Sequence, residues 1–446
     1  RTPVTTEPFH GVMSSSHKKE KAADPKKGKY QKWKPRTVDV YRREKNTQIG
    51  EGTYGSVFAA RAPDGRKVAL KKIRKDNGNE GFPITAIREI KFLKNLKHDN
   101  VVELLDVVSS PGPERSVYMV FEYCDHDLTG LLDTDPPIAF TKEQIKYYMK
   151  CLFEALYYLH KKVKILHRDV KGANILISNN GDVKLADFGL ARAHNEQGKY
   201  TNRVVTLWYR PPELLLGSYM YDQKIDMWSA GCLFAEMLRN GKPLFRGSSE
   251  LNHLEEIYKV CGTPDMNGWE EAKTLPWYKK HEPLPRRLKD EFHGVDPVAV
   301  DLLDQLLTMD PKKRIDSDKA LDHNYFFVPP EIMKKEEHPR YTKNHHEYES
   351  KKRRAQRRAQ TKARGNAYPS KRPRDANWHS QSRGQGGAPG GGRGGRGSVY
   401  PSSNRRSYPP PNSYRHGGSN RYPGSYGQAF RRGGSRGRGP GTRGPG

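Results

Sequence analysis

Two short blocks constrain this chain more than any other feature: HRDVKGAN at residues 167–174 and DFG at residues 187–189. Together they carry two carboxylates, one amide and one ammonium, on Asp169, Asp187, Asn174 and Lys171. The apolar run ahead of DFG is typical of a strand, and a strand–hairpin–strand arrangement would bring these groups to one place. Phosphoryl transfer needs such a set, because a carboxylate must accept the proton of the attacking hydroxyl while oxygen ligands hold Mg²⁺ against the phosphates.

The order and spacing of the two blocks resemble the catalytic loop and the metal loop of protein kinases. That resemblance implies that Asp169 is the catalytic base and that Lys171 steadies the γ-phosphate. It also makes Asn174 and Asp187 the metal ligands. The alternative is an ordinary charged turn, and either block alone occurs by chance in many proteins. Both blocks in this order favour the kinase interpretation.

The charge of the chain is unevenly distributed. Residues 1–43 contain 12 Lys and Arg against 4 Asp and Glu, and residues 333–446 contain 27 against 5. Residues 44–332 contain 41 against 42, so two basic arms flank a nearly neutral middle. Because only 34% of the residues are hydrophobic, we expect the middle to bury a large core and the arms to be disordered.

The four cysteines lie far apart in the middle of the chain and form no CxxC pair. The sequence therefore predicts neither a zinc site nor a disulfide framework, and a reducing compartment fits. No apolar run is long enough to span a bilayer and no hydrophobic signal core lies near the N-terminus, so we expect no membrane contact. Since the sequence begins with Arg1 rather than Met, we expect its natural start to lie upstream.

A glycine-rich stretch with the pattern GxGxxGxV occupies residues 50–57. Glycines there let backbone N–H groups approach phosphate oxygens without interference from a Cβ. Dinucleotide-binding folds share GxGxxG but lead from it into a helix. Here a strand, a turn at residues 63–65 and a second strand follow, which favours the phosphate-covering lid of a kinase. On that resemblance the lid residues that contact ATP are Ile49, Gly50, Glu51, Gly52, Thr53, Tyr54, Gly55, Ser56 and Val57. Thr53 and Tyr54 are either lid residues only or regulatory phosphosites as well.

The sequence Val68-Ala69-Leu70-Lys71 resembles the V-A-x-K element of kinases. The resemblance implies that Lys71 pairs with the α- and β-phosphates and that Ala69 lines the pocket; the alternative for Lys71 is a surface lysine. A kinase lysine needs a carboxylate partner, and Glu89 is expected to supply it from a helix that begins at Pro83, a residue favoured at a first helical position.

The helix that carries Glu89 reads PITAIRE at residues 83–89. Its spacing predicts an apolar face, with Arg88 and Glu89 projecting elsewhere. That face consists of Ile84, Ile87, Phe92 and Leu93. PITAIRE resembles the cyclin-contacting helix of cyclin-dependent kinases, in their transcriptional branch rather than the cell-cycle PSTAIRE members. The resemblance implies a cyclin of the T or K kind at residues 83–89, and it implies that Glu89 lacks its ion pair to Lys71 without a cyclin.

An apolar strand at residues 117–122 leads into a segment that resembles the kinase hinge. The resemblance implies that backbone groups of Glu122 and Cys124 bind the adenine beside Phe121, although Cys124 could equally be a buried core thiol. In the following DHDLTGLL, which again resembles the transcriptional branch, Asp127 is expected to contact the ribose. Leu176 is expected to line the ATP pocket.

The stretch TNRVVTLWYRPPE at residues 201–213 resembles the kinase activation segment. Thr201 is the expected target of an activating kinase, and its phosphate would need cationic partners. Three arginines from three motifs are the expected cage: Arg88, Arg168 and Arg192. Each of them alone could be an ordinary solvated arginine.

Val204 and Val205 resemble the pocket for the residue that follows the phosphoacceptor. In the family a residue that donates an N–H there is left unpaired, so Ser-Pro and Thr-Pro sites are preferred. A MAP kinase would share this preference, but the Thr-x-Tyr of its activation segment is missing here.

Three further features are expected to be structural. Asp226 resembles the residue that braces the backbone of the catalytic loop, and Arg314 resembles the partner of Glu213. The amphipathic pattern of residues 142–161 predicts a long core helix.

The C-terminal arm has two parts. Basic runs at residues 351–358 and 371–374 resemble a nuclear localisation signal and predict a nuclear protein; a charged helix on the domain surface is the alternative. Residues 376–446 contain no Asp or Glu and are rich in Gly, Arg, Ser, Pro and Tyr. They resemble the arginine-glycine tails of RNA-binding proteins and predict RNA contact, although a solvating tail has the same composition.

These features predict an α+β, bilobal protein kinase fold, with a small β-rich N-lobe that has one main helix, a larger α-helical C-lobe, and disordered basic arms. The expected divisions are an N-terminal arm at 1–37, the N-lobe at 38–124, the C-lobe at 125–328, a basic extension with the localisation signal at 329–375, and the Arg/Gly/Tyr-rich tail at 376–446.

The predicted activity is that of a cyclin-dependent serine/threonine kinase of the transcriptional branch, with ATP and Mg²⁺. The expected substrate is a protein with Ser-Pro or Thr-Pro sites, above all the C-terminal repeat domain of RNA polymerase II. A catalytically silent scaffold is disfavoured because no catalytic part is missing. An RNA-binding protein with a secondary kinase domain is an alternative that the tail permits. A cell-cycle kinase is another, disfavoured by the basic arms and DHDLTGLL.

Overall fold

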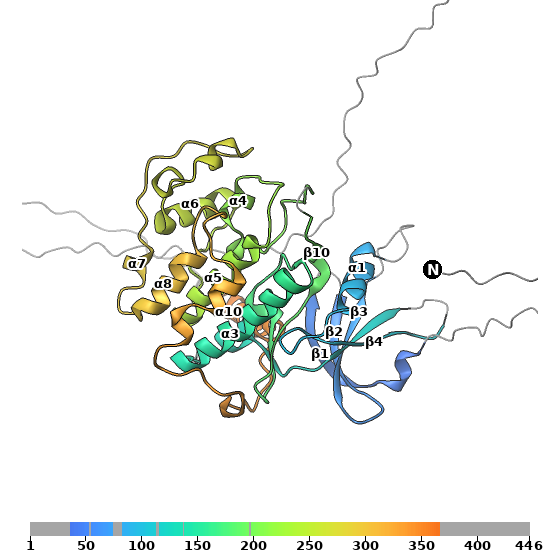
Figure 1. Cartoon of the computed structure of the whole chain (residues 1–446). Helices are drawn as coiled ribbons and strands as arrows, with labels where there is room; N and C mark the ends of the chain where they lie inside the picture. Colours follow the sequence, from blue (N-terminus) through green and yellow to red (C-terminus); the bar gives the residue numbers. More distant parts are fainter. Residues whose placement is uncertain are drawn as a thin grey trace, which may run out of the picture. The chain divides into compact units, whose positions relative to one another are not determined.

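The computed structural model describes residues 36–52, 55–74, 83–112, 116–136, 138–195 and 198–365. They form a small β-rich lobe and a larger helical lobe (Figure 1), which confirms the predicted α+β kinase architecture. Thr53, Tyr54, residues 1–35 and residues 366–446 lie outside the described residues, and with them two lid residues, most of the N-terminal arm and the predicted Arg/Gly tail.

The N-lobe is a five-stranded antiparallel sheet with the strand order β1-β2-β3-β5-β4. Its strands are β1 (Arg42–Gly52), β2 (Gly55–Arg61), β3 (Lys67–Ile73), β4 (Leu104–Ser109) and β5 (Val117–Glu122). Helix α1 (Ile84–Leu93) lies beside this sheet (Figure 1). The register sets Lys71 on β3 opposite Val57 on β2 and Met119 on β5, so the lysine lies on an inner strand between the lid and the hinge strand.

The C-lobe is mainly helical. Its α-helices are α2 (Leu128–Leu132), α3 (Lys142–Tyr157), α4 (Pro212–Leu215), α5 (Lys224–Leu238), α6 (Glu250–Cys261), α7 (Leu288–Glu291), α8 (Pro297–Leu306), α9 (Ser317–Leu321) and α10 (Glu347–Gly365). Short strands carry the catalytic segments: β6 (His126–Asp127), β7 (Ile165–Leu166), β8 (Ile175–Ile177), β9 (Val183–Leu185) and β10 (Arg192–Ala193). A π-helical turn spans Tyr158–Lys162, and 3-10 turns span Val38–Val40, Gly172–Asn174, Phe188–Leu190, Leu207–Tyr209, Asp265–Asn267, Glu270–Thr274, Asn324–Phe326 and Lys335–Glu337.

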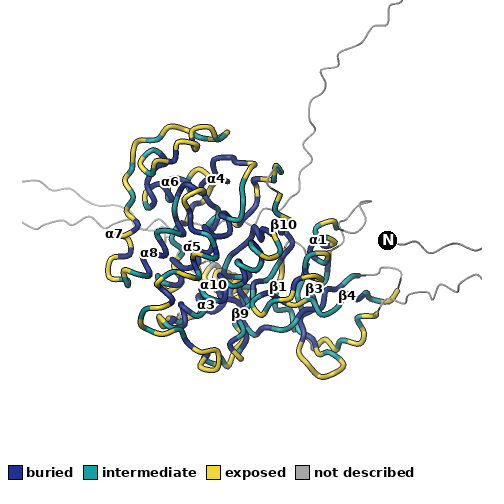
Figure 2. Tube along the Cα trace, viewed as in Figure 1, coloured by how far each residue is buried: buried dark blue, intermediate teal, exposed yellow. Residues whose placement is uncertain are grey.

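The C-lobe core is built around α3 and α5. Thr141 caps α3 in a reciprocal box with Gln144, which fixes where this long helix begins. Helix α5 is buried along almost its whole length (Figure 2), including Trp228. Because both helices are packed on several sides, the segments between them are held on a rigid base.

Only part of the apolar face predicted for α1 packs on the protein. Leu93 is buried, together with Ala86 and Glu89, whereas Ile84 is 69% exposed and Ile87 is 51% exposed. Periodicity shows which residues share a face of a helix but not which face packs on the protein. This helix turns the face with Ala86, Glu89 and Leu93 inward and leaves two isoleucines exposed to solvent.

Described structure crosses both predicted limits of the kinase domain. At the N-terminal limit, Arg36 forms an ion pair with Asp106 (3.1 Å) and Thr37 bridges to Ser109, so the arm predicted at 1–37 joins the N-lobe at its last two residues. At the C-terminal limit, residues 329–365 continue beyond the predicted C-lobe end at 328, and α10 contacts both α2 and β1.

Helix α10 carries the first basic run of the predicted localisation signal. Arg354 forms an ion pair with Asp133, and Arg357 forms one with Asp135 (2.9 Å). This run therefore lies on a charged helix at the domain surface with its side chains exposed, and its role as a localisation signal stays a prediction. No helix in the described ranges is long and apolar enough to cross a membrane.

Candidate active site

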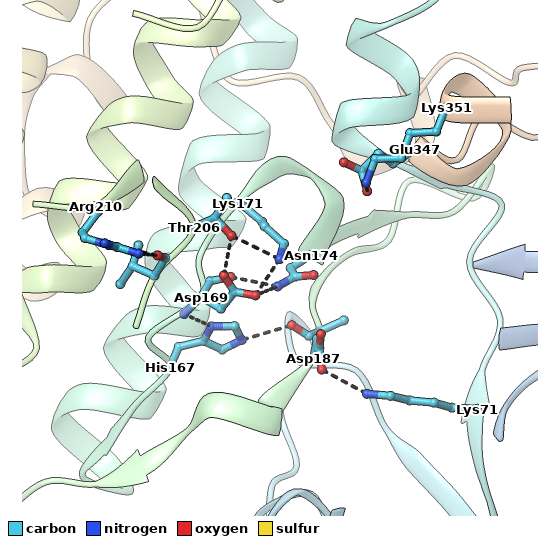
Figure 3. A network of polar contacts seen from close by, with 12 residues as sticks. Lys71, His167, Asp169, Lys171, Asn174, Asp187, Thr206, Arg210, Glu347 and Lys351 are labelled. Atoms are coloured by element: carbon cyan, nitrogen blue, oxygen red, sulfur yellow. Dashed lines mark hydrogen bonds and ion pairs between the residues drawn. The ribbon is translucent and has the colours of Figure 1, made fainter. Parts of the chain in front are cut away.

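The N-lobe lysine and the DFG aspartate meet between the lobes. Lys71 Nζ lies 2.8 Å from Glu89 Oε1 and 3.0 Å from Asp187 Oδ1, as Figure 3 shows for the aspartate. Burial lowers the pKa of Lys71, but the two carboxylates outweigh burial and raise it. Burial raises the pKa of Asp187, but Lys71 outweighs it and lowers that pKa to about 2. The aspartate is therefore ionised at neutral pH beside a charged lysine.

The structure has the ion pair between Glu89 and Lys71 formed, and the expected dependence of this pair on a cyclin stays a prediction. The inward face of α1 places Glu89 there. Ala86 and Leu93 belong to the main hydrophobic core, and α1 packs against the 3-10 turn at Phe188–Leu190 that follows Asp187. That packing holds Glu89 next to Lys71.

The catalytic loop converges on the carboxylate of Asp169 (Figure 3). Its Oδ2 accepts hydrogen bonds from Lys171 Nζ (2.6 Å) and Asn174 Nδ2 (3.1 Å). Its Oδ1 accepts one from the Thr206 hydroxyl (2.9 Å), which the sequence had not predicted. These bonds come from three directions, so they fix the orientation of the carboxylate without covering all of its lone pairs.

A buried brace holds this loop from behind. The carboxylate of Asp226 accepts the backbone N–H groups of His167 (2.9 Å) and Arg168 (2.8 Å), and His160 Nε2 contacts it at 2.9 Å. Arg168 has a positive φ of 68°, a strained conformation for a non-glycine residue. The two bonds to Asp226 hold that conformation, which confirms the predicted bracing role.

Asn174 and Asp187, the two predicted metal ligands, each keep an oxygen that could bind Mg²⁺. Asn174 donates its amide N–H to Asp169 at both O and Oδ2, which leaves the amide oxygen as its acceptor. Asp187 offers the oxygen that Lys71 does not contact. Amide and carboxylate oxygens are the ligands Mg²⁺ prefers. Among the described residues no group of three or more His, Cys, Asp or Glu side chains is placed to hold a metal ion. Two protein oxygens would leave the rest of the octahedral Mg²⁺ shell to ATP phosphates and water.

The predicted lid and adenine residues line the two sides of the interlobe region. Glycine is required at Gly55, since a Cβ there would overlap the Lys72 carbonyl oxygen. Ala69 and Phe121 face each other in register on β3 and β5 and are both buried. Leu176 on β8 lies opposite Asp127 on β6. The described lid residues are on β1 (Ile49, Gly50, Glu51 and Gly52) and β2 (Gly55, Ser56 and Val57).

The side chains of the two predicted hinge residues are engaged within the protein. The carboxylate of Glu122 accepts the Glu103 N–H (2.7 Å) and pairs with Lys184 on β9 (3.0 Å). Cys124 is 5% exposed, and burial raises the pKa of its thiol. All four cysteines are free and buried.

The carboxylate of Asp127 accepts hydrogen bonds from two backbone N–H groups. Its Oδ1 accepts the N–H of Gly130 (2.7 Å) and caps α2, and its Oδ2 accepts the N–H of Glu347 (2.8 Å) at the start of α10. Each carboxylate oxygen can accept a second bond. A ribose contact is therefore compatible with these bonds, but nothing in the sequence indicated that Glu347, 220 positions away along the chain, would bind this carboxylate.

The activation segment borders a pocket of about 590 Å³ beside α1. Thr201, Arg88 and Arg192 line it, together with Ile84 and Ile87. The third predicted cage residue, Arg168, is not among the lining residues. Its guanidinium donates to Leu190 O (2.7 Å) and to the Tyr221 hydroxyl (2.9 Å), and Tyr221 in turn donates to Thr201 O (2.7 Å). Tyr221 thus connects Arg168 to Thr201, a link that the sequence had not predicted.

The predicted proline pocket has a distinctive backbone. Val204 and Val205 are buried, and Val205 has a φ of +66°. The Val205 carbonyl accepts hydrogen bonds from Arg210 Nε (3.2 Å) and Nη2 (3.0 Å). Arg210 also pairs with Glu250 (2.7 Å), and the sequence had not singled it out. The carbonyl oxygen of Val205 is therefore already occupied by two hydrogen bonds.

Comparisons with known proteins agree with this geometry. The protein kinase domain family matches residues 43–326. The chain therefore belongs to the protein kinase family. Cyclin-dependent kinase C-1 of rice is 52% identical over 344 residues, which cover 73% of this chain and 65% of the rice protein. Human cyclin-dependent kinase 9 is 47% identical over 308 residues, which cover 66% of this chain and 82% of the human protein.

This chain is also similar to a protein kinase of known structure. The yeast RNA polymerase II CTD kinase CTDK-1 complex has a chain with a TM-score of 0.61 and 40% identity, covering 67% of this chain and 97% of that one. Within the protein kinases, the predicted resemblance to transcriptional cyclin-dependent kinases is confirmed. This chain spans about 65% of the length of the rice relative. The family uses ATP with a divalent metal.

Proposed function

We propose that this chain is a cyclin-dependent, proline-directed serine/threonine kinase that phosphorylates the C-terminal repeat domain of RNA polymerase II. The observation that carries the proposal is the convergence of Asp169, Lys171 and Asn174 with the Lys71–Asp187 pair in one interlobe site. The yeast structure of similar fold is that of an RNA polymerase II CTD kinase complex, which supports the substrate.

In this mechanism Asp169 orients the substrate hydroxyl and accepts its proton. Thr206, Lys171 and Asn174 fix the carboxylate, so little reorganisation is needed when the hydroxyl attacks. Lys171 carries its charge toward the transferred phosphoryl group, and Lys71 binds the phosphates that remain. Mg²⁺, held by Asn174 and Asp187, would neutralise phosphate charge when bound. Most of the rate enhancement then comes from position and charge rather than from covalent chemistry.

Arg210 supports the proline preference. Because it occupies the Val205 carbonyl, a residue with an N–H after the phosphoacceptor would lose a hydrogen bond to water and find no partner. Proline has no N–H to lose. An unsatisfied buried donor costs enough to lower kcat/KM by about tenfold or more.

We therefore expect a Ser-Pro repeat peptide to be phosphorylated with a kcat/KM about tenfold or more above that of the matched Ser-Ala peptide. In the Arg210→Leu variant the Val205 carbonyl becomes available, so this ratio should shrink toward one. Glu250→Gln is the matched control, because it removes the ion pair of Arg210 and leaves its bonds to Val205; the ratio should stay. An unchanged ratio in Arg210→Leu would exclude this source of specificity.

The pocket beside α1 supports a cyclin partner. Ile84 and Ile87 are exposed there, although large apolar side chains normally avoid solvent on a surface helix. Arg88, Lys91 and Arg192 surround the same pocket. A partner that buries the isoleucines would thus also contact the segment whose phosphorylation at Thr201 by an activating kinase we propose.

Two substitutions separate these roles. Ile87→Arg is expected to weaken capture of cyclin T or cyclin K by at least about tenfold, because it buries an added charge in an apolar contact. Thr201→Ala should leave capture intact and lower kinase activity of the captured complex by about tenfold. Each variant is the control for the other. Normal activity of Thr201→Ala at saturating cyclin would remove Thr201 from activation.

The proposed location is the nucleus, supported by the basic run on α10 and by the similarity to transcriptional kinases. The second basic run, at 371–374, and the tail at 376–446 lie outside the described residues. RNA contact by that tail stays a prediction.

A further inference from the structure

Residues 341–347, here called the C-terminal strap, lie against the start of the C-lobe through a cluster of rings. His126 on β6 is fully buried beneath the strap. Its ring stands edge-on to Tyr341 at 5.2 Å and lies 5.6 Å from His345, measured between ring centroids. The backbones are also joined, because the Asp127 N–H donates to His345 O at 3.0 Å. The ring of His126 thus lies between the C-lobe and the strap.

The hydrogen bonds around His126 define a single protonation state. The Asn179 amide is oriented by the strap: its Oδ1 accepts the Tyr341 N–H (2.9 Å) and its Nδ2 donates to Tyr341 O (3.2 Å). Since His126 Nε2 lies 3.0 Å from that same Oδ1, Nε2 must carry a hydrogen. His126 Nδ1 accepts the N–H of His345 at 3.1 Å, so it cannot carry one. The docked strap therefore requires a neutral ring.

A proton on Nδ1 would point at the His345 N–H and break that bond. The groups that face the ring from the surrounding elements act in both directions. Asp125 and Asp127 favour a proton on His126. The imidazoles of His338, His345 and His346 oppose it. Burial adds to that opposition, and it lowers the pKa of His126, His338 and His345 alike.

We propose that His126 is a pH-dependent latch for the C-terminal strap: its neutral imidazole holds residues 341–347 against Asp127, and its protonation releases them. The latch also involves α2, since a Cβ at Gly130 would overlap the carbonyl oxygen of His345. Release would free the Asp127 oxygen that accepts the Glu347 N–H. The latch is a property of the fold and does not depend on the proposed kinase activity.

The direction of the pH effect follows from proton linkage. Docking holds the pKa of His126 below the ordinary histidine value of 6.5, chiefly through burial, and release of the strap raises it toward that value. Docking is therefore at full strength above pH 6.5 and weakens as the pH falls below it, because only the released form takes up the proton. One such histidine changes the docking equilibrium by about tenfold between pH 7.5 and pH 5.5.

Hydrogen exchange of the full chain tests the latch. The readout is the protection factor of the amides in 341–347 at pH 7.5 and pH 5.5, each corrected for the intrinsic exchange rate. In the wild type the protection should fall by about tenfold or more at the lower pH. His126→Asn keeps an acceptor near the position of Nδ1 and cannot titrate. The loss of strap protection at the lower pH should therefore be about tenfold smaller in this variant than in the wild type. Gly130→Ala should remove strap protection at both pH values while keeping α2, since alanine favours helix.

Amides within α5 serve as the internal control and should keep their protection in all three proteins, which excludes global unfolding. A wild-type strap whose protection does not change with pH overturns the proposal. So does a His126→Asn variant with the same pH dependence as the wild type, because the titrating group would then be another one. Retained strap protection in Gly130→Ala would overturn the contact between the strap and α2 on which the latch depends.

Discussion

Replacing Asp169 by Asn is expected to lower turnover by about a thousandfold while leaving ATP affinity nearly unchanged. The amide cannot accept a proton from the substrate hydroxyl. Lys171 and Asn174 both donate N–H groups to one oxygen of this carboxylate. An amide NH₂ at that position would face these donors and could not accept their hydrogen bonds. The ATP contacts of Lys71 and Asp187 do not involve Asp169, so nucleotide binding should persist.

The measurement is steady-state phosphorylation of a Ser-Pro repeat peptide by the cyclin complex, combined with nucleotide binding by calorimetry. Asp290→Asn is a suitable control, because Asp290 is an exposed carboxylate on α7 in the same lobe. It should behave as the wild type in both assays. Turnover that survives in Asp169→Asn would remove Asp169 from the reaction, and a parallel loss of ATP affinity would point to a misfolded loop instead.

Arg314→Met is expected to destabilise the C-lobe by about 3–5 kcal/mol. The guanidinium is fully buried and forms a bidentate pair with Glu213, with Nη1–Oε1 at 2.7 Å and Nη2–Oε2 at 2.9 Å. It also donates to the carbonyls of Lys224 (2.8 Å) and Thr308 (3.0 Å), and it stacks over Trp228. Methionine fills part of the volume but leaves a buried carboxylate and several carbonyls without donors.

Thermal unfolding should show the loss as a fall in Tm of about 10 °C. Lys312→Met is the matched control two residues away. Lys312 also pairs with a glutamate, Glu271 (2.9 Å), but both side chains are largely exposed. Solvent screens such a pair, so the Tm of this variant should stay at the wild-type value. Equal Tm values for Arg314→Met and Lys312→Met would show that burial of the first ion pair is unimportant.

The features that could be predicted from sequence are those whose functional side chains lie within one short motif. Lys71, Asp169 and Asp187 each sit in a motif that fixes both the side chain and its neighbours, and the structure brings them together between the lobes. The partnership of Arg314 and Glu213 could also be predicted, although 101 residues separate them, because each belongs to its own motif.

The rest depends on contacts that leave no local trace. The bond from Glu347 to Asp127 joins residues 220 positions apart, and neither has a sequence pattern that requires the other. The role of Arg210 depends on the positive φ of Val205, which directs the Val205 carbonyl toward the guanidinium and which no sequence pattern indicates. The exposure of Ile84 and Ile87 on α1 could not be predicted, because apolar periodicity does not distinguish a face that packs on the protein from one that a partner would cover.

The burial of Cys124 has a consequence for the design of inhibitors. A thiol reacts with electrophiles as its thiolate, and the apolar surroundings of this hinge residue keep it protonated at neutral pH. An electrophilic compound bound beside the predicted hinge would therefore react only slowly with this sulfur. Its residence time would have to come from shape and hydrogen bonds, and covalent chemistry would have to be directed at a nucleophile elsewhere in the cleft.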